Sequence, residues 1–263
     1  MPSTNASATE PKNQIQTYRK MMDVLRSFSR VDRQLPLAAI AASAGLPRAT
    51  AHRILTALRE VGFIEQDSRR GTYGLGIGLF ELGSLALANM DLLREGKPFL
   101  DQLTQASGTA AHLGVFNGME MVVVEREDQP DRPMRTIRPV EAAPAYCTGL
   151  GKAVLAFQDK EVVDRVIAAG LKRFTRSTIC SAAALRRELA RVRQRGYAID
   201  NGEHQMWVRC IAAPIRDSSG RVVAALSVTG HVDQLAEERT PVLAELVMQA
   251  GDSISRHLGY EAG

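Results

Sequence analysis

Basic and small residues gather at the start of one predicted helix. After Gly45 and Pro47, apolar residues at Ala51, Ile54 and Leu58 follow helical spacing and leave one face polar. Arginine can bond guanine or phosphate, threonine can bond phosphate or contact the thymine methyl, and alanine lets the backbone approach closely. This chemistry predicts a DNA-contacting face, and its residues are Arg48, Ala49, Thr50, His52 and Arg53.

A second pair of cations follows this helix. The segment "FIEQDSRRGTYGL" predicts a strand over residues 63–66, a turn, and a returning strand over residues 72–75. We expect Arg69 and Arg70, at the tip of this hairpin, to contact phosphates or the minor groove, as the wing of a winged helix does. The alternative is a solvated turn that carries two arginines, but the helices upstream favour the wing.

The elements before the basic helix are those that would position it. Apolar residues in "QTYRKMMDVLRSFSR" have helical spacing, and "LPLAAIAASAG" predicts a second, short helix that ends at Gly45. Glycine permits a tight turn at this place, and Pro47 suits the first turn of the next helix. Two helices joined in this way form a helix-turn-helix, in which the second helix enters the DNA major groove.

The distribution of charge agrees with a DNA-binding N-terminal segment. The chain has 263 residues, enough for two domains, and a net charge of +4. Residues 1–75 hold 11 Lys and Arg against 6 Asp and Glu, so the basic excess lies in the N-terminal third. A compact basic segment is the electrostatic signature of a nucleic-acid binder.

Composition also excludes several classes of protein. A membrane span needs an apolar run of about 18 residues, and the sequence has none of that length. The polar start of the chain does not resemble a secretory signal, so we expect a cytoplasmic protein. Three separated cysteines without a CxxC pair, and five scattered histidines, predict neither a disulfide framework nor a metal site. No cofactor is expected.

Several segments, in the same order, resemble the IclR family of bacterial transcription regulators. The segment "LPLAAIAASAGLPRATAHRILTALREVGFIEQDSRRGTYGLG" is similar to the family's winged helix, and "LGIGLFELGSLAL" is similar to its linker helix. Three later segments also match, namely "PAYCTGLGKAVLA", "ALRRELARVRQRGYAIDNGEH" and "VRCIAAPIRDSSGRVVAALSVTG". The resemblance covers residues 14 to 259. It implies a ligand-responsive regulator that binds double-stranded operator DNA as a homodimer or a dimer of dimers.

The expected fold is α+β. We expect a disordered tail over residues 1–13, a winged helix-turn-helix DNA-binding domain over 14–76, a linker helix over 77–93 and an effector-binding domain over 94–260. In the last domain, turn signals such as Asn117-Gly118 separate predicted antiparallel strands, one of them near residues 134–138, with helices between and after them. The resemblance implies a form distantly like a GAF domain.

A ligand site is expected where "CTGLGKAVLAF" begins a helix. Free amides at a helix N-terminus bind anions, and the family's effectors are commonly small organic or aromatic acids. Ser227 and Thr229 alternate with apolar neighbours along a strand, so their hydroxyls share a face. The resemblance implies an effector site made of Tyr146, Gly149, Leu150, Asp200, Cys210, Ser227 and Thr229.

The sequence departs from the family in two places near this site. Many members have a histidine where Tyr146 stands, and the usual acidic pair after the Gly-Tyr strand is here "DNGE", with Asn201 in the second place. We expect Tyr146 and three neighbours to form a wall suited to an aromatic or hydrophobic acid rather than a small oxoacid. These neighbours are Met134, Met206 and Trp207.

Each effector residue also has a simpler interpretation. Alternating Ser227 and Thr229 could lie on a solvated sheet face, Asp200 could shape a turn, and Cys210 could be a small buried apolar residue. Three other functions remain open: an architectural DNA-binding protein, a metabolite-binding module with a vestigial helix-turn-helix, and an enzyme acting on a small acid. An enzyme is disfavoured because His204 is the nearest base and nothing in the sequence orients it.

Overall fold

The computed structural model describes residues 11–29, 32–88, 90–129 and 142–261. The chain divides into two compact units, residues 1–89 and 90–263. The strand expected near residues 134–138, and Met134 with it, lie outside the described residues.

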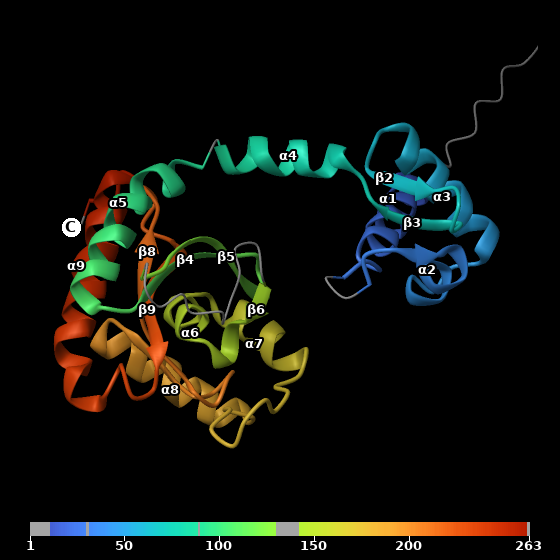
Figure 1. Cartoon of the computed structure of the whole chain (residues 1–263). Coiled ribbons are helices and arrows are strands. Elements are labelled where there is room, and N and C mark those ends of the chain that lie inside the picture. The colour runs from blue at the N-terminus through green and yellow to red at the C-terminus, as the bar shows by residue number, and fades with distance from the viewer. Residues whose placement is uncertain (1–10, 30–31, 89, 130–141, 262–263) are drawn as a thin grey trace, which may run out of the picture. The chain divides into compact units, whose positions relative to one another are not determined.

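The first unit has a small sheet and helices around its own core (Figure 1). Its sheet is antiparallel with strand order β1-β3-β2. Its core is built from apolar side chains of α1, α2, α3 and the sheet, among them Val24, Ile40, Leu55 and Ile64. The elements are α1 (Pro11–Leu25), β1 (Leu35–Pro36), α2 (Leu37–Ser43), α3 (Arg48–Glu60), β2 (Ile64–Asp67), β3 (Thr72–Leu75) and α4 (Ile77–Ala88).

The turn between α2 and α3 forms as the sequence predicts. Gly45 has a φ of +62°, in the left-handed region that disfavours residues with a Cβ. The amide of Leu46 then donates to the carbonyl oxygen of Ala41 at 2.9 Å, and Pro47 precedes the first residue of α3. The winged helix-turn-helix prediction is confirmed, and β2 and β3 form its hairpin.

The second unit is a six-stranded antiparallel sheet with helices on both faces. The strand order is β6-β5-β4-β9-β8-β7, so two strands far apart in the sequence, β4 and β9, lie side by side at its centre. Helices α5 and α9 pack on one face, and α6, α7 and α8 on the other (Figure 1). This arrangement confirms the expected α+β class.

The elements of the second unit begin after Asn89. They are α5 (Asp91–Ser107), β4 (Ala110–Phe116), β5 (Glu120–Glu127), β6 (Ala142–Pro144), the 3₁₀ turn η1 (Ala145–Cys147), α6 (Gly149–Leu155), α7 (Lys160–Ala168), α8 (Ala182–Arg195), β7 (Ala198–Asn201), β8 (Val208–Arg216), β9 (Val222–His231), η2 (Glu237–Arg239) and α9 (Thr240–His257).

Two boundaries differ from the sequence-based expectations. Helix α1 begins at Pro11, inside the segment expected as a tail, because proline is well suited to the first turn of a helix. The apolar segment expected as a linker helix over residues 77–93 contains all of α4 and only the start of α5. Between them Met90 has an extended backbone, with φ −85° and ψ 101°, so α4 and α5 are two separate helices rather than one continuous helix.

Candidate functional site

The outer face of α3 carries the residues expected to contact DNA. Ala51, Ile54, Leu55 and Leu58 are buried and hold α3 against the core of the first unit. The opposite face is therefore presented to solvent. Four of the five expected residues on it are exposed and Thr50 is half-buried; the exposed ones are Arg48, Ala49, His52 and Arg53.

The hairpin tip is organised by an aspartate that the sequence analysis did not single out. The Asp67 carboxylate accepts hydrogen bonds from the amides of Arg69, at 2.9 Å, and Arg70, at 3.3 Å. The Gly71 amide donates to the Asp67 carbonyl oxygen at 2.8 Å, with a φ of +66° at Gly71. Both arginine side chains are exposed at this tip. An Asp four residues before a Gly in a predicted hairpin was the available signal.

In the second unit, strand register brings the expected effector residues onto one face of the sheet. Asp200 on β7 pairs with Cys210 on β8, and Cys210 pairs with Thr229 on β9. Two residues along β9, Ser227 lies on the same face. The Ser227 and Thr229 hydroxyls are 3.2 Å apart, and the Thr229 hydroxyl donates to the Cys210 sulfur at 3.3 Å. All four side chains are buried, so the solvated-face interpretation of Ser227 and Thr229 is wrong.

Helix α6 starts directly above these strands. A Cβ placed on Gly149 would lie 3.1 Å from the Cβ of Cys210, a tight contact that favours glycine at this position. On the other side, a Cβ on Gly114 of β4 would lie 3.2 Å from a methyl carbon of Leu150. The first turn of α6 therefore spans from β8 to β4, across β9.

The start of α6 is fixed by a capping threonine. The Thr148 hydroxyl accepts a hydrogen bond from the Gly151 amide at 3.2 Å and donates to the Pro144 carbonyl at 3.0 Å. The amides of Gly149 and Leu150 belong to the first turn, where helix geometry supplies no acceptor from within the helix. These amides and the helix dipole favour a negative group beside the strands.

Asp200 shapes a turn and is also buried among the expected effector residues. Its carboxylate accepts a hydrogen bond from the Glu203 amide at 2.7 Å and thereby shapes the turn after β7. The side chain is only 2% exposed. Burial, together with the charge of Glu203, raises the pKa of Asp200 to about 7. Near neutral pH both the protonated and the ionised form of this carboxyl group are therefore populated.

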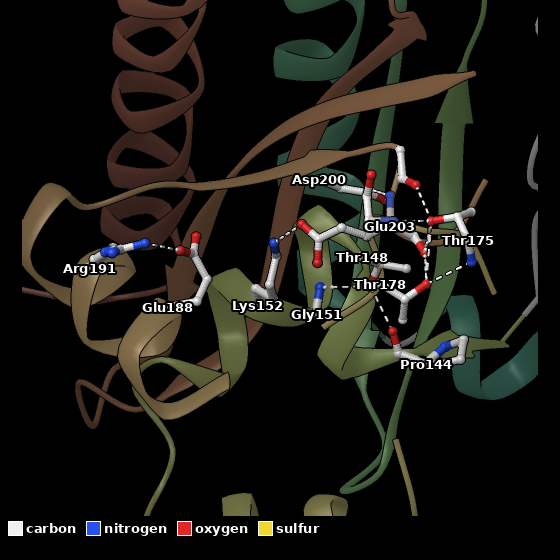
Figure 2. Close-up of polar contacts among 12 residues, drawn as sticks. Pro144, Thr148, Gly151, Lys152, Thr175, Thr178, Glu188, Arg191, Asp200 and Glu203 are labelled. Carbon is white, nitrogen blue, oxygen red and sulfur yellow. Dashed lines mark hydrogen bonds and ion pairs between the residues drawn. The ribbon is translucent and has the colours of Figure 1, made fainter. Parts of the chain in front are cut away.

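A buried ion pair lies beside Asp200 and was missed in the sequence (Figure 2). Lys152 of α6 pairs with Glu203, and both side chains are buried. The Thr178 hydroxyl donates to the carbonyl oxygen of Glu203 at 2.6 Å, and the Thr175 hydroxyl donates to that of Gly202 at 2.6 Å. The pair therefore ties α6 to the turn that holds Asp200. A lysine inside the apolar segment "GLGKAVLAF" was the only signal.

The expected aromatic wall is not assembled by the described residues. The Tyr146 ring is buried, and its hydroxyl donates to the Lys172 carbonyl at 2.6 Å. Burial raises the pKa of Tyr146 to about 12. Trp207, by contrast, is 54% exposed, and Met206 is exposed as well. They lie on the loop after the Asp200 turn, where no apolar layer covers them, so this expectation is wrong for Met206 and Trp207.

Comparison with known proteins identifies the class of molecule that has this site. A sequence profile of the IclR helix-turn-helix domain matches residues 19–68, and one of the bacterial transcriptional regulator IclR C-terminal domain matches residues 84–256. The chain belongs to the IclR family. It is therefore a DNA-binding transcription regulator with a C-terminal effector domain.

Individual IclR-type relatives match over most of their length. The HTH-type transcriptional repressor AllR of Salmonella typhi is 33% identical over 248 residues, 94% of this chain and 91% of that protein. An IclR transcriptional regulator of Silicibacter sp. has a TM-score of 0.86 at 26% identity, covering 94% of this chain and 98% of that one. An IclR homolog of Microbacterium hydrocarbonoxydans, solved in complex with 4-hydroxybenzoate, has a TM-score of 0.75 at 29% identity over 92% and 98%.

The chemistry around Cys210 suits binding better than nucleophilic catalysis. Burial and the nearby Asp200 charge raise the pKa of the Cys210 thiol, so the reactive thiolate is disfavoured. His204 instead contacts the ring of Phe174 edge-on, with ring centroids 4.9 Å apart.

Two further observations concern ions and membranes. Within the described ranges, no three His, Cys, Asp or Glu residues lie close enough together to hold a metal ion. None of the helices formed by the described residues is both long and apolar enough to cross a bilayer.

Proposed function

We propose that this protein controls transcription from a two-fold operator in response to a small organic acid, with an aromatic carboxylate as the favoured class. The observation that carries the proposal is the row of buried polar side chains, Asp200, Cys210, Thr229 and Ser227, under the first turn of α6. These side chains hydrogen-bond one another or the Glu203 amide, and a carboxylate placed at the helix amides would give the two hydroxyls a further, charged partner.

The residues proposed to hold the acid have separate roles. The amides of Gly149 and Leu150 receive the carboxylate, while the hydroxyls of Ser227 and Thr229 bond its oxygens or a second polar group. Protonated Asp200 can donate a hydrogen bond, and Cys210 and the ring of Tyr146 supply apolar contact. The complex of the Microbacterium homolog with 4-hydroxybenzoate supports an aromatic acid as the ligand class.

The proposed DNA contacts follow from the exposed faces of α3 and the hairpin. Arg48, Thr50 and Arg53 would read bases or bind phosphates in the major groove, with Ala49 and His52 beside them, and Arg69 and Arg70 would bind the backbone or the minor groove. A pseudo-palindromic operator requires two copies of this unit, so we propose a homodimer or a dimer of dimers.

The effector test is a gel shift on the DNA upstream of the protein's own gene, with excess nonspecific competitor. The reaction is repeated with benzoate, 4-hydroxybenzoate, phenylacetate, pyruvate and glyoxylate. A discrete shift that one aromatic acid alters supports operator and effector together. A response to the small oxoacids alone contradicts the aromatic class. A shift that no acid changes contradicts the sensing role of the second unit.

The DNA-binding face is tested by Arg48→Ala and Arg53→Ala in the same assay at fixed salt. Each change removes a base or phosphate contact, and we expect operator affinity to fall by a factor of about 5 to 100. The matched control is Arg187→Ala, which removes the same charge from an exposed position on α8 of the second unit. If the α3 variants bind as tightly as the control, the recognition-helix assignment is wrong.

A further inference from the structure

One buried histidine lies beside the proposed effector site and is not used by it. His112 sits on β4 and is 1% exposed. Its Nε2 atom has no hydrogen-bond partner within the described part of the chain. A buried polar atom left unpaired costs about 1–3 kcal/mol, and proteins rarely accept that cost without a reason. A histidine kept only for packing would be expected to have this nitrogen satisfied.

The strand register places His112 on the face that carries the effector residues. His112 pairs with Ser227 of β9, which pairs in turn with Ala212 of β8. Side chains directly opposite on neighbouring antiparallel strands have Cβ atoms about 5 Å apart. Two residues along β4 from His112, Gly114 lies under the side chain of Leu150. His112 is therefore next to Ser227 and to the first turn of α6.

The chemistry of this imidazole separates its role from that of the helix amides. Burial, together with the charge of Arg126 on the neighbouring strand, lowers the pKa of His112 to about 4. The ring is thus neutral at physiological pH, so it offers one donor or one acceptor without a positive charge. It therefore suits a hydroxyl or a carbonyl oxygen, and it offers a carboxylate a hydrogen bond but no compensating charge.

We propose that His112 determines effector specificity, by a hydrogen bond from or to its Nε2 that selects acids carrying a hydroxyl or oxo group besides the carboxylate. This inference rests on the proposed effector site, in which the carboxylate occupies the first turn of α6. The second polar group then reaches across β9 to β4. An acid without that group leaves Nε2 unpaired, and sites of this kind reject such an analogue more strongly than its size alone would predict.

The test is isothermal titration of the full chain with two matched pairs of acids. Benzoate is compared with 4-hydroxybenzoate, and propionate with pyruvate. For wild type, we expect the acid with the additional oxygen to bind about tenfold more tightly in at least one pair, which corresponds to about 1.4 kcal/mol. In His112→Leu the affinity ratio of that pair should fall close to one, while the simpler acid keeps its affinity within about twofold.

Two controls separate specificity from general damage to the site. Thr229→Val removes a hydroxyl from the same face and should weaken both acids of a pair by a similar factor, leaving their ratio intact. His112→Asn, which keeps a donor and an acceptor, should retain part of the ratio. The thermal unfolding of each variant and its operator shift without ligand show whether the fold is preserved.

The outcomes distinguish the inference from the proposed function. If the acids bind but His112→Leu keeps the wild-type ratio, or wild type shows no preference within either pair, the role of His112 is wrong and the effector site stands. If none of the four acids binds to wild type, the proposed effector class fails and the inference fails with it.

Discussion

The raised pKa of the Asp200 carboxyl group makes the stability of the protein depend on pH. In the unfolded chain its pKa is near 3.8, whereas in the folded protein it is raised to about 7. Between these values the native state binds more protons than the unfolded state. The free energy of unfolding therefore falls as pH rises through this window, and levels off above it.

We expect Asp200→Asn to flatten this pH dependence. The amide oxygen of asparagine can still accept the hydrogen bond from the Glu203 amide, but the group no longer titrates. Because one unit of pKa shift corresponds to about 1.4 kcal/mol, the variant should gain on the order of 1–4 kcal/mol relative to wild type between pH 4.5 and pH 8. Urea denaturation at several pH values measures this difference. If the free energies of unfolding of the two proteins change with pH in parallel, Asp200 does not control this pH dependence.

The ion pair next to Asp200 explains why a fully buried lysine is tolerated in α6. Lys152 and Glu203 compensate each other's charge, whereas either one alone in this environment would be strongly destabilising. Burial also raises the pKa of Glu203, and the Lys152 charge opposes that rise. The pair thus contributes little net stability and instead specifies how α6 meets the Asp200 turn.

At the scale of the elements, the sequence predicts each helix and turn far better than it predicts which elements lie side by side in the fold. Gly45, Pro47 and the apolar stripe of α3 contain this helix-turn-helix signal within one continuous stretch of the sequence, residues 45–58. The grouping of His112 with Ser227 cannot be read this way, because β4 and β9 become adjacent only when the sheet forms. Lys152 was missed for the same reason, since its partner Glu203 lies on a distant turn.

The close approach of α6 to its preceding turn makes a sharp test of the site's framework. A Cβ on Gly151 would overlap the backbone of Ala145, where no side chain can move aside. We expect Gly151→Ala to destabilise the second unit by about 3 kcal/mol or more, since relief requires a shift of the backbone.

The matched control for Gly151→Ala is Gly83→Ala, the same change in α4 at a position where nothing lies within 4 Å. That variant should be neutral or more stable by up to about 1 kcal/mol, because alanine is the better helix former. Thermal unfolding by circular dichroism compares the two. Equal melting temperatures would mean that the helix shifts at little cost and that the contact does not fix the site.

At the scale of the whole molecule, α4 exposes more apolar surface than an isolated chain would favour. Phe80 is 69% exposed, and Ile77, Leu82 and Leu85 are exposed with it. Clusters of this kind mark interaction surfaces. A second copy of the chain is the occupant that the proposed two-fold operator requires, so we expect α4 to contribute to a dimer interface.

Phe80→Ser should therefore shift the protein toward the monomer. The loss of a buried aromatic side chain from an interface is expected to raise the dimer dissociation constant by a factor of about 10 or more. Sedimentation velocity over a range of concentrations measures the shift. The control is Val242→Ser, at a position on α9 that is 64% exposed. A dimer unaffected by Phe80→Ser, or equally weakened by both changes, would place the interface elsewhere.

The strand order of the second unit also decides what an incomplete chain could do. The ribosome completes the first unit, with its own core, before most of the second has been made, and domains of nascent chains fold in that order. The central strand β9 and its covering helix α9 come last, so β4 has one neighbour until nearly the end of synthesis. A premature stop codon before β9 would leave the first unit intact and the second unit without a central strand and the helix that packs on it. We expect such a mutation to abolish the response to effector while the first unit still folds, rather than to remove every function of the protein.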